Sequence, residues 1–245
     1  MEKSARLVTK HGTDILESTK FMRGELAAQL ARWVRSASRQ GWWTNFSDDL
    51  LKDLDVHLAY ESEATVARLY TIPILPVLLQ TPDYTRAYYR ELERRPDEDV
   101  SELLDIRLKR QEALTSRPDL PPLELVAVTH ESSLHQRVGS PEVMHAQLDA
   151  LIKRSMAPNV RFHVLPFSAQ PIFSMTCMYA LFEYADSAEA GVVHVETHAG
   201  FLSQENPARV RRYRAAHDAL VHAALSTGDS RELVASVRDE IELTS

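Results

Sequence analysis

The stretch IPILPVLLQTPDYTRAYY (Ile72–Tyr89) decides the fold, because one helical pattern ends in it and another begins. Pro73 and Pro76 cannot continue a helix, so they predict an extended segment. Thr81 and Pro82 then predict a helix start, with threonine as the N-cap and proline at the first helical position. The stretch therefore divides an upstream helical segment from further helices downstream.

Helices are predicted on both sides of this stretch from apolar residues that recur every three or four positions. Gly41 is expected to end the first of them, and the bulk of Trp42 and Trp43 directly after it predicts an anchor onto the main body. The predicted helices in this half of the chain cover residues 22–38, 47–70, 82–94 and 100–115.

The pattern changes after residues 117–122, which hold three prolines and are predicted to form a linker. Alternating or continuous apolar residues beyond it predict strands, with helices between and after them. Asp229-Ser230-Arg231-Glu232 fits a capping box for the last helix. The predicted strands are 123–129, 160–165, 175–184 and 192–197, and the predicted helices are 141–156, 207–224 and 229–242.

This order of elements predicts an α+β fold. We expect a helical subdomain at the N-terminal side, packed on a mixed or antiparallel sheet of about four strands, with helices at the C-terminus. Residues 1–40 form an N-terminal segment with one linker helix. Residues 41–245 form the main body, helical over 41–116 and sheet-containing over 123–245.

Composition narrows the class of protein. The 245 residues carry a formal net charge of −7, and seven glycines include neither a dinucleotide nor a phosphate-loop motif. One cysteine, Cys177, cannot form an internal disulfide, which favours a reducing cytoplasm. The N-terminus has no signal-peptide core and no apolar run is long enough to cross a membrane. We expect no cofactor and no membrane association.

Several motifs together resemble one family, the actinobacterial antitoxin-like helix-turn-helix (XRE-type) transcriptional regulators. The resemblance runs from about Gln40 to the end of the chain. Its motifs are Gly41-Trp42-Trp43, Glu61-x-Glu63-Ala64, Leu78-Leu79-Gln80-Thr81-x-x-Tyr84-x-Arg86, Arg107-x-x-Arg110-Gln111, Glu131-x-x-Leu134, Val138-Gly139, Gln147-Leu148, Val164-Leu165-Pro166 and Glu196-Thr197.

The resemblance implies a non-enzymatic regulatory module of transcription control, with a small-molecule ligand or a small protein partner as its input. The 39 residues before Gln40 are too few for the five-helix DNA-reading domain and linker helix of that family, and residues 22–38 match only the linker helix. Direct DNA binding is therefore not expected from this chain alone. A coding region that starts upstream of Met1 is the alternative, and a homodimer is left open.

Several positions depart from the family pattern, among them Val77, His130, Cys177 and His194. They motivate a second hypothesis, in which the same fold has been recruited as an enzyme or a small-molecule-binding protein of specialised metabolism. No nucleophile-elbow, zinc-protease or CxxC motif occurs, so the catalytic residues are unknown. A cavity lined by the changed residues would favour this hypothesis, and a filled one would count against it.

The candidate ligand-binding residues come mostly from the family motifs. Arginines at helical spacing can grip a carboxylate or phosphate with their planar fork. The same arginines can pair with Glu131 and Glu196 inside the fold, and this structural role is favoured. Cys177 lies in an apolar stretch, where a buried thiol is usually inert. The candidates are Gln80, Tyr84, Arg107, Arg110, Gln111, Glu131, Cys177 and Glu196.

A weak metal candidate is His194-x-Glu196-x-His198, because alternate residues of a strand share one face. His163 on another predicted strand would add a ligand if the register allowed it. The favoured explanation is that these are polar positions at a strand end, so no metal is expected.

Overall fold

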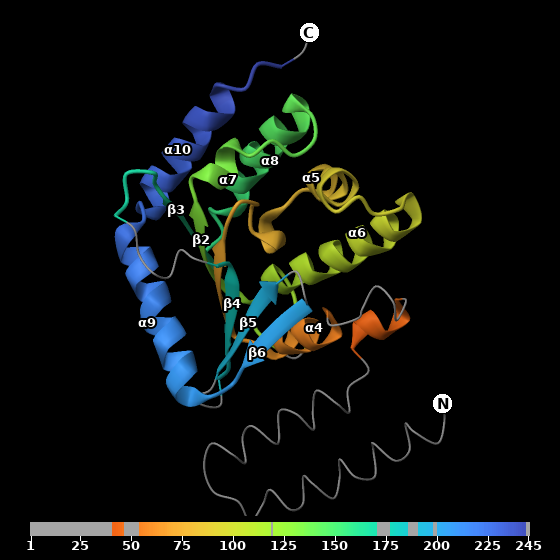
Figure 1. Ribbon diagram of the computed structural model, residues 1–245, viewed down its shortest axis with the longest axis vertical. Helices are drawn as coiled ribbons and strands as arrows, with labels where there is room; N and C mark the ends of the chain where they lie inside the picture. The colour runs from red at the N-terminus through yellow and green to blue at the C-terminus, as the bar shows by residue number, and fades with distance from the viewer. Residues whose placement is uncertain are drawn as a thin grey trace, which may run out of the picture.

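The computed structural model describes residues 41–46, 54–118, 120–170, 177–185, 191–197 and 200–243. Within these ranges seven α-helices and one mixed sheet of six strands form three layers (Figure 1). The α+β class predicted from the sequence is confirmed. Among the helices of these ranges, none combines the length and the apolar character that crossing a membrane requires.

The sheet has the strand order β3-β2-β1-β4-β5-β6. The first three strands are parallel to one another, and β4, β5 and β6 continue the sheet as an antiparallel meander. The strands are β1 (Val66–Thr71), β2 (Glu124–His130), β3 (Val160–Leu165), β4 (Tyr179–Glu183), β5 (Gly191–Thr197) and β6 (Gly200–Gln204).

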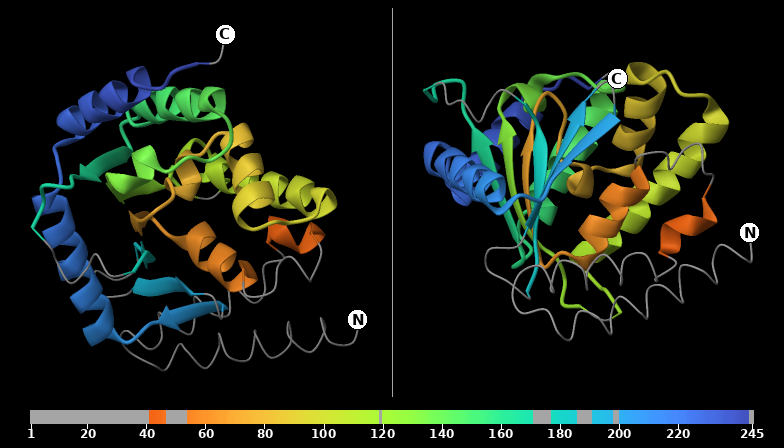
Figure 2. Two further views of the ribbon diagram at one scale, coloured as in Figure 1. Left: turned by 45° about the horizontal axis from the view of Figure 1, so that its top comes forward. Right: turned by 60° about the horizontal axis from the view of Figure 1, so that its bottom comes forward.

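Helices cover both faces of this sheet. Two crossovers join the parallel strands, and such connections are almost always right-handed, so their helices share one face. A single long helix, α9, lies on the other face (Figure 2). The helices are α4 (Leu54–Glu63), α5 (Pro82–Ala87), α6 (Asp97–Gln111), α7 (Ser132–His135), α8 (Pro141–Arg154), α9 (Pro207–Ala223) and α10 (Thr227–Asp239). Shorter turns are η1 (Trp42–Asn45), η2 (Val77–Leu79), the π-helical turn η3 (Tyr88–Leu92) and η4 (Glu112–Leu114).

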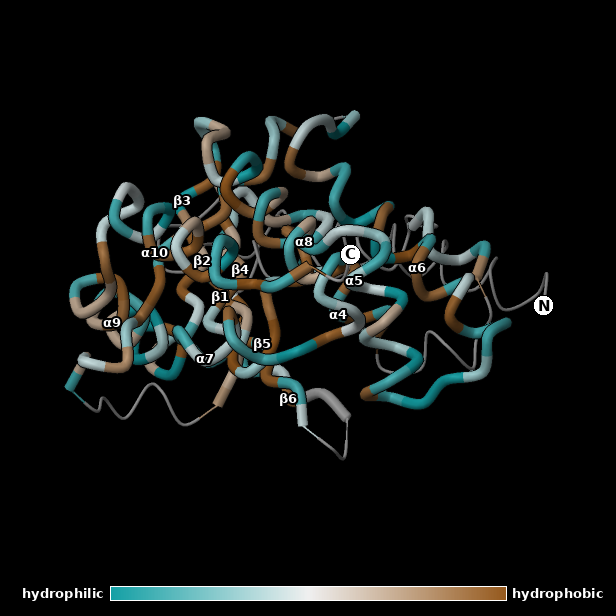
Figure 3. Tube along the Cα trace, turned by 90° about the horizontal axis from the view of Figure 1, so that it is seen from above, coloured by the Kyte–Doolittle hydropathy of each residue, from teal (hydrophilic) through white to brown (hydrophobic). Residues whose placement is uncertain are grey.

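The core follows from the alternation of side chains along each strand. In β1, Ala67 and Leu69 enter the larger cluster beneath α5, α8 and α10, while Tyr70 enters the cluster beneath α9. In β4, Phe182 and Leu181 divide in the same way. Apolar residues accordingly concentrate along the strands, and polar residues on the outer sides of the helices (Figure 3).

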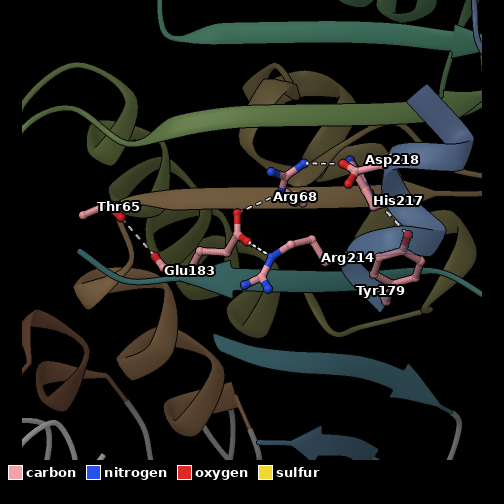
Figure 4. Close-up of polar contacts among 7 residues, drawn as sticks. All are labelled: Thr65, Arg68, Tyr179, Glu183, Arg214, His217 and Asp218. Carbon is pink, nitrogen blue, oxygen red and sulfur yellow. Dashed lines mark hydrogen bonds and ion pairs between the residues drawn. The ribbon is translucent and has the colours of Figure 1, made fainter. Parts of the chain in front are cut away.

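Charged residues fasten α9 to its face of the sheet (Figure 4). Arg68 of β1 donates to the carboxylate of Glu183 at 2.7 Å and to Asp218 of α9 at 3.1 Å. Arg214 of α9 donates to the other oxygen of Glu183. Glu183 therefore bridges two strands and a helix, and the two arginines hold its pKa below the usual range although burial alone would raise it.

The structure corrects several element predictions. Residues 66–70 are not the end of a helix but the strand β1, and β1 is next to β2 and β4 inside the sheet. The strand β6 was not predicted, and the sheet has six strands instead of about four. The predicted helix over 22–38 and the start of the one over 47–70 lie outside the described residues.

The last helix begins earlier than its predicted capping box. The N-cap of α10 is Ser226, whose hydroxyl accepts from the backbone N–H of Asp229 at 3.1 Å and donates to the Asp229 carboxylate at 2.7 Å. Ser226 and Asp229 therefore cap the start of α10, which lies upstream of the predicted Asp229.

Replacing Ser226 with alanine should lower the free energy of unfolding by about 1 kcal/mol, because the first turn of α10 loses its acceptor. Ser236→Ala, at an exposed position later in the same helix, is the matched control and should change stability by less than about 0.5 kcal/mol. Urea unfolding measures both variants. Equal effects of the two substitutions would contradict the capping role.

Candidate ligand-binding site

A group of titratable residues lies between α4, α6 and β5, on the face of the sheet opposite α9. Its centre is Arg110 of α6, whose Nε and Nη2 donate to the two carboxylate oxygens of Glu61 in α4, both at 2.8 Å. The side chains are only 9% and 5% exposed. This two-point ion pair joins the two helices through residues that are 49 positions apart in the sequence.

The ion pair sets the protonation of both partners. Burial alone would raise the pKa of Glu61, but the charge and hydrogen bonds of Arg110 outweigh it and lower the pKa to about 2. Burial would likewise lower the pKa of the Arg110 guanidinium, and Glu61 raises it instead. Both groups are therefore ionised at neutral pH.

Two histidines extend this cluster toward the sheet. The Nε2 of His57 lies 2.9 Å from Nη2 of Arg110, which can only donate, so His57 accepts there. The His57 ring meets the ring of His194 edge to face, with centroids 4.7 Å apart, and Nδ1 of His194 lies 3.0 Å from the hydroxyl of Ser203 in β6. Burial first, and then Arg110, lowers the pKa of His57. Burial, His57 and Arg110 lower the pKa of His194 to about 3.

A cavity of about 910 Å³ opens at the outer end of the cluster. Its lining includes Trp42 and Trp43 of η1 and the ion-paired side chains of Glu61 and Arg110. The remaining lining residues come from the N-cap of η1, from α4, from the end of α6 and from the segment 112–120. They are Gly41, Leu58, Ser62, Glu63, Lys109, Glu112, Ala113, Thr115, Ser116, Arg117, Pro118 and Leu120. The volume lies in the range of small-molecule sites.

The tryptophans of this cavity were predicted only as an anchor. They do pack against the small core formed by α4 and α6 around Leu58 and Ile106. Their rings meet edge to face, with centroids 5.7 Å apart. Because both rings are only partly buried, they also present aromatic surface to the cavity. Two adjacent tryptophans after a predicted helix were the signal that the sequence offered for this site.

Three of the predicted ligand-binding residues, Gln80, Tyr84 and Gln111, instead hold the backbone of the segment 72–81. Gln80 donates from Nε2 to the carbonyl of Leu75 at 2.8 Å, and the hydroxyl of Tyr84 accepts from the N–H of Leu75 at 3.3 Å. Gln111 donates to the carbonyl of Gln80 at 2.7 Å. The Leu-Leu-Gln-Thr motif therefore begins in the short turn η2 and continues in an irregular segment, and its buried polar groups are satisfied by side chains from elsewhere.

Arg107 contacts the same segment through the side chain of Gln80. It is 7% exposed and donates to Oε1 of Gln80 at 2.5 Å and to the hydroxyl of Tyr89 at 2.6 Å. Its guanidinium carbon lies 4.7 Å and 5.4 Å from the ring centroids of Tyr89 and Tyr88. Aromatic faces and neutral oxygens thus stabilise this cation. The favoured structural role of the arginines is supported, but their contact partners are Glu61, Gln80 and Tyr89 instead of Glu131 and Glu196.

Three further predicted ligand residues lie away from the segment 72–81. Glu131, at the end of β2, accepts from the backbone N–H of Phe167 at 2.6 Å and so fixes the exit of β3. Cys177 is exposed, in contrast to the buried position predicted for it. Glu196 is exposed on β5, within electrostatic reach of Arg107 and Arg110. None of the three lines the cavity.

The metal candidate is not assembled in the described part of the chain. No group of three His, Cys, Asp or Glu side chains there is placed to hold an ion. His194 directs Nδ1 to Ser203, and His198 lies outside the described residues. His163 lies on β3, where its ring is hydrogen-bonded to the carbonyl of Leu225. Three strands separate β3 from β5.

The fold and site together define an α+β domain with a mixed sheet and a cavity beside a buried ion pair. The chain belongs to a family described as a domain of unknown function, DUF5753, whose model matches residues 54–236. No curated protein and no solved structure matches the chain.

Proposed function

We propose that this chain is a non-enzymatic regulatory module that receives a small molecule in the cavity between η1, α4 and α6. The observation that carries the proposal is the cavity itself, about 910 Å³, whose lining holds two tryptophans and a desolvated ion pair. A mostly apolar pocket with a few fixed polar groups is the usual form of a ligand site. Transcription control in the cytoplasm, without direct DNA contact by this chain, is the role that the resemblance to antitoxin-like regulators suggests.

The described side chains support binding over catalysis at this position. Arg110 and Glu61 neutralise each other, and Lys109 is paired with Glu112 at 2.5 Å. A paired, hydrogen-bonded carboxylate with a lowered pKa is a poor general acid or base at neutral pH. The rival hypothesis of a recruited enzyme requires changed residues at the cavity, but Val77, His130, Cys177 and His194 do not line it.

Ligand binding is tested with the full chain and a cavity-blocking variant. Ser116 is exposed and lines the cavity, so Ser116→Trp should fill part of it. Ser236→Trp, on the exposed side of α10, is the matched control. A bound small molecule present at about 100 times its Kd should stabilise the unmodified chain and the control by about 2.7 kcal/mol, seen as a higher Tm, and leave Ser116→Trp unchanged.

The probes are 2-naphthamide, 2-naphthoate and 2-naphthylmethylamine, which share one ring system and differ in charge. Stabilisation by any of them that Ser116→Trp abolishes supports the proposal, provided that mass spectrometry recovers the probe unaltered. Chemical conversion of a probe would favour an enzyme. Equal shifts in both tryptophan variants, or no shift with all three probes, would overturn the assignment of the cavity. A gel-shift assay with random and genomic DNA should show no sequence-selective complex.

A further inference from the structure

One nitrogen of the Arg110 guanidinium, Nη1, has no hydrogen-bond partner among the residues that the structure describes. Glu61 occupies Nε and one hydrogen of Nη2, and His57 occupies the second hydrogen of Nη2. The Arg110 side chain is more than nine-tenths buried and lines the cavity. Nη1 is not among the fully buried side-chain atoms that lack a partner, so it is reached from the cavity and can donate to a group bound there.

The charge of the cavity decides which acceptor fits. Its described lining holds three cations, Lys109, Arg110 and Arg117, and three carboxylates, Glu61, Glu63 and Glu112. The positive charge of Arg110 is already neutralised by Glu61, 2.8 Å away. A carboxylate or phosphate placed at Nη1 would lie close to the buried carboxylate of Glu61 and be repelled by it. An uncharged carbonyl oxygen accepts the same hydrogen bond without that repulsion.

The tryptophans decide what the rest of the ligand is. Trp42 and Trp43 offer two ring faces at right angles, 86° apart, so a planar ring can stack on one and meet the edge of the other. Both geometries are favourable for aromatic pairs. Leu58 adds an apolar contact.

We propose that the cavity binds an uncharged, planar aromatic molecule that carries a carbonyl acceptor, as aromatic amides and lactams do. The carbonyl accepts from Nη1 of Arg110, and the ring system packs against Trp42 and Trp43. This inference rests on the proposed function, because it names the class of ligand for the same cavity. It adds that the ligand is selected by lack of charge and by a single acceptor.

The test compares matched probes on the unmodified chain by calorimetric titration. 2-Naphthamide should bind about ten- to a hundred-fold more tightly than 2-ethylnaphthalene, which has the ring and no acceptor, because a hydrogen bond to a charged donor is lost. It should also bind at least ten-fold more tightly than 2-naphthoate. The unmodified protein is used because a change at Arg110 itself is expected to impair folding.

Two variants locate the binding. Trp43→Leu should weaken 2-naphthamide about three- to ten-fold by removing the aromatic contact, whereas Phe167→Leu, exposed at the far end of β3, should leave it unchanged. Tighter binding of 2-naphthoate that Ser116→Trp blocks would overturn this ligand class and leave the proposed function standing. Equal affinity for 2-naphthamide and 2-ethylnaphthalene would remove the role of Arg110. Failure of all probes to bind would overturn both proposals.

Discussion

Replacing Arg110 with methionine is expected to lower the free energy of unfolding by about 3–5 kcal/mol, because the buried carboxylate of Glu61 is then left without its cation. Removing one partner of a buried ion pair exposes the cost of burying the other, which is far larger than the net value of the pair. Urea unfolding at pH 7.5, followed by circular dichroism, measures the change.

A double variant separates the pair from its surroundings. Arg110→Met combined with Glu61→Leu should recover most of the loss, since neither residue then carries a buried charge. The exposed pair Arg90–Asp97, with side chains 50% and 79% exposed, is the matched control, and Arg90→Met should cost less than about 1 kcal/mol. A loss for Arg110→Met no larger than for Arg90→Met would contradict the buried-pair account.

Acidification is expected to destabilise the protein well above the pH at which its carboxylates titrate. His194 and His217 are 3% and 0% exposed, and burial lowers the pKa of each from 6.5 to about 3. Neighbouring positive groups act in the same direction, Arg110 on His194 and Arg68 on His217. Both histidines stay neutral in the folded chain, whereas the unfolded chain binds protons below about pH 6.5.

The sign and size of this loss of stability follow from the different numbers of protons that the folded and unfolded chains bind. A histidine whose folded pKa is depressed stabilises the fold fully above its unfolded pKa, and this contribution falls with pH between about 6.5 and 3. From pH 7.5 to pH 5.0 each histidine should cost roughly 2 kcal/mol, so together roughly 4 kcal/mol. His57, whose pKa is also lowered, adds to the loss. Glu61, with a pKa of about 2, loses its contribution only below about pH 4.5, outside this window.

The measurement is the free energy of urea unfolding at several pH values between 5.0 and 7.5. His217→Gln should reduce the slope against pH by about one proton, because a neutral amide replaces the titrating ring. His222→Gln, on the exposed side of α9, is the control for a histidine change in the same helix. A slope that His217→Gln leaves intact would show that His217 is protonated in the folded state.

The sequence predicted elements well where one pattern allowed one interpretation. The strand over 160–165 matches β3 at both ends, because apolar residues alternate there without interruption. The assignment of 66–70 to a helix was wrong because Thr65 and Leu69 fit helical spacing and strand alternation equally. Neither glycine nor proline marks the end of α4 at Glu63. The short strand β6 carries too few residues for a period to show.

For the site, the sequence placed side chains on common faces but did not identify their partners. Helical spacing correctly put Arg107 and Arg110 near each other on α6. Their contacts come from residues brought close only by folding, above all Glu61, whose choice as the partner depends on how α4 crosses α6. The cavity depends on that crossing as well. Periodicity carries no information about the distance between two helices, so neither the ion pair nor the cavity was predictable.

The position of β1 has a consequence for how this body can be shared among proteins. The strand that pairs with both β2 and β4 comes from the N-terminal side of the proline-rich segment 117–122. If the chain were divided at that segment, the larger piece would expose β2 and β4 as unpaired edge strands. The smaller piece would keep β1 as an isolated strand. Gene fusion can therefore join this domain to other domains only at its outer boundaries. The proline-rich segment, which the sequence predicts to be a linker, is not a position at which the domain can be divided.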